Sequence, residues 1–126
     1  MGTNNNILSV KNLNFSYGNN KIINDISFDI KEGSFVSILG PNGAGKSTLV
    51  NIISKILGKF GGSIEVCGDD ISKLDIKDIA KIIAVVPQST NPSFSFTVEE
   101  MVLMGRHPYI SRFESESKKD FEIVRE

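Results

Sequence analysis

The sequence predicts an α/β fold in which an antiparallel β part precedes a core of short strands and helices. Three observations predict it. Apolar and polar residues alternate on both sides of a Gly/Asn turn in residues 7–30. A short apolar stretch, a glycine-rich loop and a helical pattern follow one another in residues 35–57. Two more short apolar stretches, residues 63–67 and 82–86, flank a second helical pattern, and such alternation is typical of an α/β core.

The composition fits a folded globular chain of about one domain's length. The chain has 126 residues, of which 40% are hydrophobic and 23% charged, and its formal net charge is −1. So little net charge provides no broad positive surface, and we expect no nucleic-acid partner. The single cysteine, Cys67, excludes an internal disulfide and is expected to be buried. The sequence has no apolar run long enough to span a bilayer and no signal-peptide pattern, which predicts a cytoplasmic protein.

The antiparallel β part covers about residues 6–34. Residues 7–15 and 22–30 alternate as strands, and residues 18–20 (GNN) supply the turn between them, so a hairpin is predicted. In the second strand Ile26, Phe28 and Ile30 are expected to lie on one face.

The core covers about residues 35–88 and begins with a predicted buried strand, residues 35–39. From Lys46 the pattern becomes helical, and this helix is expected to end at Gly58. Residues 63–67 predict a strand, residues 75–81 a helix and residues 82–86 a second buried strand. The apolar positions of the first helix recur at helical spacing: Leu49, Ile52, Ile53, Ile56 and Leu57.

Residues from about 89 to 126 predict the start of a mainly helical subdomain. A loop over residues 89–96 comes first. Thr97 and Glu100 then have the spacing of a capping box, which predicts a helix running to about Met104. Residues 106–109 (RHPY) are expected to break that helix. Residues 115–126 predict a further helix.

The motif that carries chemistry is residues 40–47, GPNGAGKS, which match the phosphate-binding pattern G-x-x-x-x-G-K-[ST]. Its glycines let successive N–H groups point at phosphate oxygens, and the helix that follows directs its N-terminal N–H groups at the same anion. The lysine adds a positive charge for the β- and γ-phosphates, and the two hydroxyls serve Mg²⁺ and the α-phosphate. We therefore predict a nucleotide-phosphate site formed by Asn42, Gly43, Ala44, Gly45, Lys46, Ser47 and Thr48, with Ser47 as the Mg²⁺ ligand.

With this loop in place, the sequence resembles the ATP-binding cassette (ABC) ATPases, whose P-loop typically reads GPNGAGKST, as residues 40–48 do. Residues 13–18, LNFSYG, resemble that family's aromatic loop, which implies that Tyr17 stacks on the adenine of ATP. An aromatic residue that only packs on its hairpin neighbour is the alternative for Tyr17. Residues 85–88, VVPQ, look like the family's Q-loop, which implies that Gln88 contacts Mg²⁺ and the γ-phosphate side.

The resemblance makes Lys46 and Gln88 the candidate catalytic residues, although a surface glutamine after a strand is the alternative for Gln88. Residues 96–109, FTVEEMVLMGRHPY, resemble the importer ATPases for iron chelates (siderophores, haem) and cobalamin. This implies an ATP-binding subunit that pairs with a second such subunit and lies on the inner face of the membrane through a permease. The permease contact would use the Q-loop and residues 94–109, where Phe94, Phe96 and Tyr109 are expected to be partly exposed.

Three alternatives to the iron-chelate and cobalamin group stay open. One is a manganese or zinc importer ATPase, and another is a soluble, non-transport ABC ATPase. A P-loop enzyme outside the ABC family, such as a nucleotide kinase, is disfavoured by the spacing of Tyr17 and Gln88 around the P-loop.

The resemblance covers residues 6–126 and about the first half of a family domain, which implies an ABC ATPase core that is incomplete at its C-terminus. The family's Walker B acidic pair, signature motif and switch histidine have no match here, and hydrolysis needs such groups. We expect this chain alone to bind nucleotide weakly, not to turn over ATP, and to be poorly stable because the strands over residues 35–39 and 82–86 lack neighbours.

Other polar positions have simpler explanations than chemistry. Asp69 and Asp70 follow a strand and are expected to form a turn rather than to hold a metal. Glu99 and Glu100 begin a helix, where carboxylates are favoured. His107 precedes a proline in a loop and is expected to be solvated.

Overall fold

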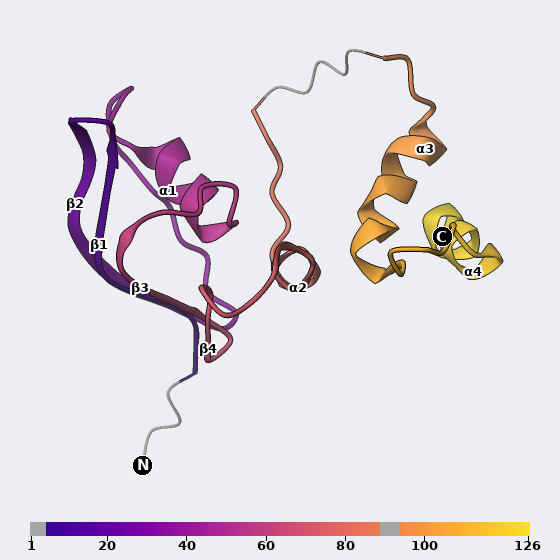
Figure 1. The fold of residues 1–126 in the computed structure, drawn as a ribbon, viewed down its shortest axis with the longest axis horizontal. Helices are drawn as coiled ribbons and strands as arrows, with labels where there is room; N and C mark the ends of the chain where they lie inside the picture. Colours follow the sequence, from indigo (N-terminus) through magenta and orange to yellow (C-terminus); the bar gives the residue numbers. More distant parts are fainter. Residues whose placement is uncertain (1–4, 89–93) are drawn as a thin grey trace. The chain divides into compact units, whose positions relative to one another are not determined.

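The computed structural model describes residues 5–88 and 94–126, and the predicted α/β fold class is confirmed. The chain divides into two compact units, Met1–Ile79 and Ala80–Glu126 (Figure 1). Its elements are β1 (Asn6–Tyr17), β2 (Asn20–Lys31), α1 (Lys46–Ile53), β3 (Gly61–Val66), β4 (Asp69–Asp70), α2 (Ile76–Ile82), α3 (Val98–Leu103), the 3-10 helix η1 (Met104–Tyr109) and α4 (Lys118–Arg125).

The described residues of the first unit form an antiparallel sheet of strand order β2-β1-β3-β4. The predicted hairpin is confirmed, with Tyr17 of β1 opposite Asn20 of β2 beside the turn. In β2, Phe28 and Ile30 are half-buried as expected, but Ile26 is 37% exposed. The pairing of β1 with β2 is irregular in this stretch of the ladder, which interrupts the alternation of inward and outward side chains.

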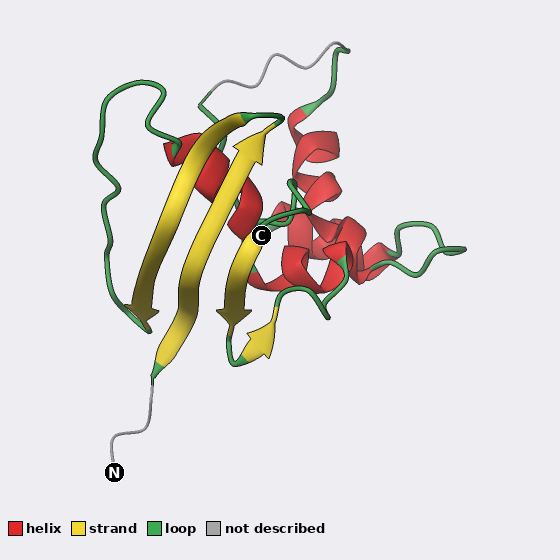
Figure 2. Cartoon of the chain, turned by 60° about the vertical axis from the view of Figure 1, so that its left-hand side comes forward, coloured by secondary structure: helices red, strands yellow, loops and turns green. Residues whose placement is uncertain are grey.

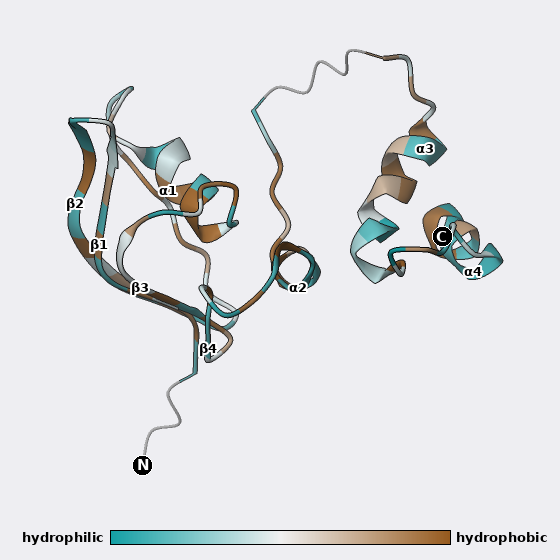
Figure 3. Cartoon of the chain, viewed as in Figure 1, coloured by the Kyte–Doolittle hydropathy of each residue, from teal (hydrophilic) through white to brown (hydrophobic). Residues whose placement is uncertain are grey.

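Helix α1 lies over one face of this sheet (Figures 1 and 2). Strongly hydrophobic residues occur both along the strands and on α1 (Figure 3). Burying one such aliphatic side chain stabilises a fold by about 1.5–3 kcal/mol, so the buried side chains of these two layers hold α1 against the sheet. The fully buried side chains come from both layers and from the chain after β4: Val10, Leu13, Ile23, Ile52, Ile64, Ile71 and Ile79.

The prediction that residues 35–39 and 82–86 form two buried strands is wrong. Neither segment is a strand, and both expose apolar side chains. Phe35 is 96% exposed, Leu39 91% and Val86 95%. A buried parallel strand needs a hydrogen-bonding neighbour, and among the described residues the paired strands are only β1 to β4.

Helix α1 ends earlier than its apolar pattern predicts. It runs only to Ile53, and Lys55 adopts a left-handed conformation with φ 60°. The Lys55 ammonium donates to the carbonyl oxygens of Ile71 and Leu74, which hold the chain in this turn. Ile56 is consequently 67% exposed instead of lying on the buried face of the helix.

The turn around Cys67 also departs from expectation. Cys67 is exposed, whereas a small buried residue was predicted. It has φ 51° and begins the tight connection from β3 to β4, outside both strands. Asp69 and Asp70, expected as a turn, form the short strand β4, with Asp69 opposite Val66 of β3.

In the second unit α3 starts and ends as predicted, whereas α4 starts at Lys118, three residues later than the predicted helix over residues 115–126. The capping box of Thr97 and Glu100 opens α3, and a further capping box opens α4 at Ser117. The α-helix does not continue through residues 106–109, as predicted, but these residues form part of the 3-10 helix η1 instead of a loop. Pro108 lies inside η1 and has no N–H to donate to a carbonyl one turn earlier. Across residues 5–88 and 94–126, no helix is long and apolar enough to cross a membrane.

Candidate functional site

The candidate site is the loop over residues 40–48, which enters α1 from the exposed segment 35–39. Two glycines in it have left-handed backbones, Gly43 with φ 83° and Gly45 with φ 91°. A Cβ on Gly45 would lie 3.0 Å from Cγ2 and 3.3 Å from the carbonyl oxygen of Ile22 in β2. Glycine is therefore required at position 45 both by conformation and by the close approach of the loop to the sheet.

The N-terminus of α1 is open. Its first intrahelical bond runs from the N–H of Leu49 to the carbonyl of Gly45, at 2.9 Å. The N–H groups of Lys46, Ser47 and Thr48 therefore have no carbonyl one turn earlier in the helix. No side chain caps this end, and its first turn holds no acidic residue. The positive end of the helix dipole is thus left without a negative partner.

The other α-helices of the described residues begin differently. Each has a carboxylate in its first turn that accepts a backbone N–H near the helix start. The backbone N–H and hydroxyl of Thr97, for example, lower the pKa of Glu100. Among the α-helices of the described residues, only α1 lacks an acidic residue in its first turn. The pairs are Asp75 and Asp78 at α2, Thr97 and Glu100 at α3, and Ser117 and Asp120 at α4.

Lys46 holds its ammonium over the loop that precedes it. Its Nζ donates to the carbonyl oxygen of Gly40 at 2.6 Å and to that of Pro41 at 2.7 Å. The ion pairs in the described part of the chain do not include Lys46, so no carboxylate neutralises its charge. A fixed cation next to open N–H donors is an arrangement that recognises a multiply charged anion such as phosphate.

The two hydroxyl residues after Lys46 differ in exposure. Ser47 is exposed to solvent, and Thr48 is buried beside Leu49 with 9% exposure. Of the two, the Ser47 hydroxyl is the accessible oxygen at the open end of α1. Oxygen ligands of this kind suit Mg²⁺, which retains several waters when a protein binds it.

Tyr17 lies at the hairpin end of β1. Its ring is 51% exposed, and it meets the ring of Phe15 edge-on, with centroids 4.8 Å apart and planes at 87°. The contact with a hairpin neighbour, the simpler alternative, is therefore present. The exposed half of the ring stays available for stacking on a ligand.

Gln88 is exposed and lies in a bend that follows residues 83–87, which form neither helix nor strand. It belongs to the second unit, whereas the P-loop and Tyr17 belong to the first. The predicted loop that continues from Gln88 falls mostly on residues 89–93, outside the described residues. Residues 40–48 lie wholly within the first unit, so their geometry is described without Gln88.

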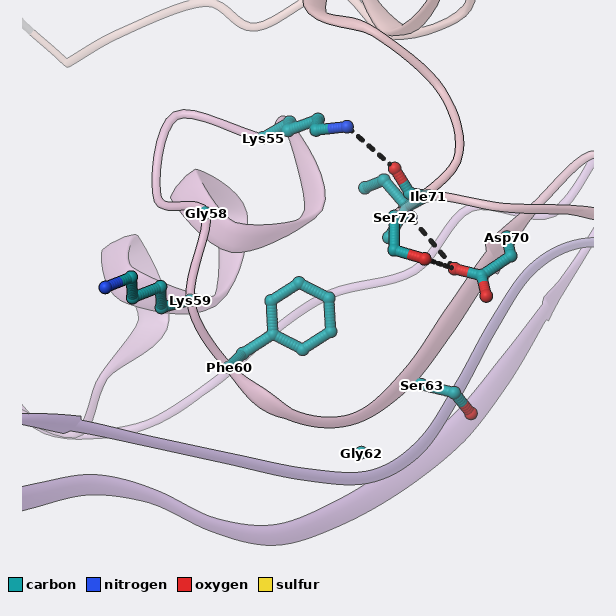
Figure 4. Close-up of a pocket in the computed structure, with 9 residues that line it drawn as sticks. All are labelled: Lys55, Gly58, Lys59, Phe60, Gly62, Ser63, Asp70, Ile71 and Ser72. Atoms are coloured by element: carbon teal, nitrogen blue, oxygen red, sulfur yellow. Dashed lines mark hydrogen bonds between the residues drawn. The ribbon is translucent and has the colours of Figure 1, made fainter.

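A hollow of about 430 Å³ lies beyond the C-terminal end of α1 (Figure 4). The Lys55 Nζ at its wall donates to Ile71 at 3.0 Å, and Asp70 accepts from the Ser72 N–H at 2.8 Å and hydroxyl at 2.7 Å. The Ser72 hydroxyl and N–H lower the pKa of Asp70. Charges bonded within the wall indicate a structural role. Among the described residues no group of three or more His, Cys, Asp or Glu could hold a metal.

Sequence reasoning missed a polar cluster in the second unit. Arg106 of η1 donates from Nε to Asp120 Oδ1 of α4 at 3.0 Å, and its guanidinium carbon lies 4.4 Å from the ring centroid of Tyr109. Asp120 is 8% exposed and is one of the few buried polar residues in the described chain. The S-x-x-D pattern of residues 117–120 was a signal for the α4 cap. Nothing local indicates that Arg106 reaches it.

Comparison with known proteins gives concordant matches. A family model described as ABC transporter matches residues 23–126. The cobalamin import ATP-binding protein BtuD of Halobacterium salinarum is 40% identical over 106 residues, 84% of this chain and 27% of that protein. The iron(3+)-hydroxamate import ATP-binding protein FhuC of Bacillus subtilis is 36% identical over 120 residues, 95% of this chain and 45% of that protein.

A solved structure of a metal-chelate type ABC transporter, in an inward-facing conformation, is similar with a TM-score of 0.71 and 31% identity. The match covers 94% of this chain and 42% of the solved one. The chain thus spans less than half the length of these three relatives.

Proposed function

Because this chain belongs to the ABC transporter family, we propose that it forms the nucleotide-binding part of the ATP-binding subunit of an importer. The family implies that ATP is the nucleotide. The observation that carries the proposal is the open N-terminus of α1 beside the Lys46 ammonium, in a chain whose other described α-helices have acidic first turns.

The residues of the loop have separate roles in this proposal. The N–H groups from Asn42 to Thr48, including those of Gly43, Ala44 and Gly45, bind phosphate oxygens, and Lys46 binds the β- and γ-phosphates. Ser47 and Gln88 are the residues that would hold Mg²⁺. Tyr17 stacks on adenine with its exposed ring face. Bound ATP would supply the cleavable phosphoanhydride bond and Mg²⁺ would neutralise charge on its phosphates, and Lys46 and Gln88 are the residues of this chain proposed to act on that bond.

We propose that the imported ligand is an iron chelate or a cobalamin-type molecule. The two relatives described above are named for the import of cobalamin and of iron(3+)-hydroxamate, and the solved relative is of metal-chelate type. These names favour the chelate group over a manganese or zinc importer and over a soluble ABC ATPase.

We propose further that residues 94–109 dock on a transmembrane permease, which would place the subunit on the cytoplasmic face of the membrane. Exposure supports this: Phe94 is 74% exposed, Phe96 42% and Tyr109 55%, and α3 has no buried residue. Exposed aromatic residues gathered in one short segment are typical of a surface that binds another protein. A second ATP-binding subunit is the proposed dimer partner.

Nucleotide binding tests the first part. A fluorescent ATP analogue titrated into the chain with Mg²⁺ should bind at least about tenfold more weakly to Lys46→Ala, since one charge-assisted contact is worth about 1.5–3 kcal/mol. Lys59→Ala is the matched control, an exposed lysine of the same unit that lies outside the loop. Equal affinity of Lys46→Ala and the parent chain would contradict the proposal.

Uptake tests the second part. Cells that make the complete protein with Lys46→Ala should lose uptake of a radiolabelled iron chelate or of radiolabelled cobalamin, while Lys59→Ala cells retain it. Normal uptake of both ligands by Lys46→Ala cells would rule out the importer assignment.

A further inference from the structure

We propose that Arg106 is a positioning residue, which holds the ring of Tyr109 in one orientation for docking on the permease. This inference rests on the docking role proposed for residues 94–109. The contacts that carry it run through three side chains, from the start of α4 through Asp120 and Arg106 to Tyr109.

The first part of this chain of contacts fixes the carboxylate. Asp120 Oδ2 accepts from the Ser117 N–H at 2.9 Å and from the Ser117 hydroxyl at 2.6 Å. Its side chain is only 11% exposed. Asp120 thus belongs to the helix cap and has little freedom to follow a moving partner.

The second part fixes the guanidinium. Arg106 Nε donates to Oδ1 of Asp120, the oxygen that the Ser117 bonds leave free, and the Arg106 side chain is 23% exposed. A guanidinium is planar and rigid, so a bond from Nε to a fixed carboxylate, together with the contact of the guanidinium with the Tyr109 ring, limits the directions in which its flat face can point. An ammonium in the same place would keep the charge but would have no face to orient.

The third part fixes the aromatic ring. The Arg106 guanidinium lies 4.4 Å from the Tyr109 centroid, and the Lys81 ammonium lies 5.9 Å from it. Tyr109 follows Pro108 at the end of η1, and the ring is 55% exposed. An exposed aromatic residue that is already oriented loses less conformational freedom on binding, which makes it an efficient docking anchor.

A second ion pair in the same unit provides an internal comparison. Arg125 Nε of α4 donates to Glu99 Oε1 of α3 at 2.8 Å, whereas the Arg106–Asp120 pair joins α4 to η1. The Arg125 and Glu99 side chains are 71% and 44% exposed, and no aromatic ring contact involves Arg125 in the described residues. Arg125→Lys therefore changes an ion pair between helices without touching an aromatic ring.

Tyrosine fluorescence tests the orientation directly. The sequence has two tyrosines and no tryptophan, so in a Tyr17→Phe background all of the signal comes from Tyr109. In the 126-residue chain, Arg106→Lys should raise acrylamide quenching of Tyr109 about twofold, and Asp120→Asn should raise it similarly. Arg125→Lys should leave it unchanged. An Arg106→Lys signal equal to that of the parent, or an equal rise in Arg125→Lys, would overturn the positioning role.

Docking is tested with the natural Tyr17 in the complete protein, co-expressed with its permease. The share of protein retained on permease-containing membranes should fall several-fold in Arg106→Lys and stay constant in Arg125→Lys. Full retention of Arg106→Lys would overturn the link from orientation to docking. Failure of the Lys46→Ala binding test would instead count against the proposed nucleotide function and leave the Tyr109 result intact.

Discussion

Gly62 lies directly against the backbone of Asn12. A Cβ on Gly62 would come within 2.4 Å of the Asn12 carbonyl oxygen. Asn12 itself has φ 49°, and the pairing of β1 with β3 is irregular between Lys11 and Asn14. Strand β3 therefore passes an irregular stretch of β1, and only a residue without a side chain fits there.

We expect Gly62→Ala to destabilise the first unit by about 3 kcal/mol or more, because it adds a backbone clash to an unfavourable φ of +89°. Gly68→Ala is the matched control. Gly68 has nearly the same φ, +87°, but nothing within 4 Å of an added Cβ, so it should lose only about 1 kcal/mol. Urea unfolding of the two variants and the parent chain measures the loss in free energy of unfolding that each substitution causes. Similar losses in the two variants would show that the contact with Asn12 is unimportant.

Ser47→Asp should affect folding and binding in opposite directions. A carboxylate in the first turn of α1 supplies the missing partner of the helix dipole and should stabilise the chain by about 0.5 kcal/mol. The same charge should repel phosphate and weaken binding of the ATP analogue at least tenfold. Asn51→Asp adds the same charge farther along α1 and should change affinity little. A Ser47→Asp variant that binds as the parent does would mean that the open helix end is not the anion site.

We expect acid to lower the stability of the second unit because it protonates the Asp120 carboxylate. The Ser117 hydroxyl and N–H, with Arg106, lower the pKa of Asp120 from 3.8 to about 2. Because the folded chain favours the ionised form, this carboxylate stabilises the fold fully above about pH 4, and that stabilisation is lost as the pH falls toward 2. Helical circular dichroism of the parent should show this loss over that window, while Asp120→Asn starts less stable and changes less.

Asp69→Asn serves as the control for that titration. Asp69 is an exposed carboxylate of the first unit, so its removal should leave the acid response of the second unit as in the parent. An identical acid response of Asp120→Asn and the parent would contradict the role of the Asp120 carboxylate.

Val86→Lys should raise the monomeric fraction of the chain. Val86 is 95% exposed in the apolar run of residues 82–86, and an unpaired apolar run of this kind promotes strand pairing between molecules. Phe113→Lys is the control, since Phe113 is equally exposed at 95% but has polar or charged neighbours on both sides. Size-exclusion chromatography over a range of concentrations compares them. An equal rise in the monomeric fraction of both variants would show that an added lysine improves solubility in general, and would contradict a specific role of the apolar run.

The parts of the fold predicted correctly depend on short-range patterns. The hairpin of β1 and β2 follows from alternation around one turn, and the α3 cap follows from the spacing of Thr97 and Glu100. The P-loop motif fixes both the glycines with positive φ and the start of α1 at Lys46. Each of these features is determined by residues within a few positions of one another.

The parts that were missed depend on partners distant in sequence. Residues 35–39 have the composition of a buried strand, but strand formation needs a neighbour that composition does not reveal. Lys55 ends α1 early because carbonyls of residues 71 and 74 bind its ammonium. Arg106 likewise pairs with a carboxylate 14 positions away.

The two bonds from Lys46 to the carbonyls of Gly40 and Pro41 have a consequence for the energetics of binding. An anion that recruits the ammonium must compete with the loop for it, so the arrival of phosphate is an exchange of partners and not a simple gain of contacts. The two carbonyls are then released to water or to a new donor. Their infrared stretching frequencies, isolated by isotope labelling, would therefore report occupancy of the loop from inside the protein.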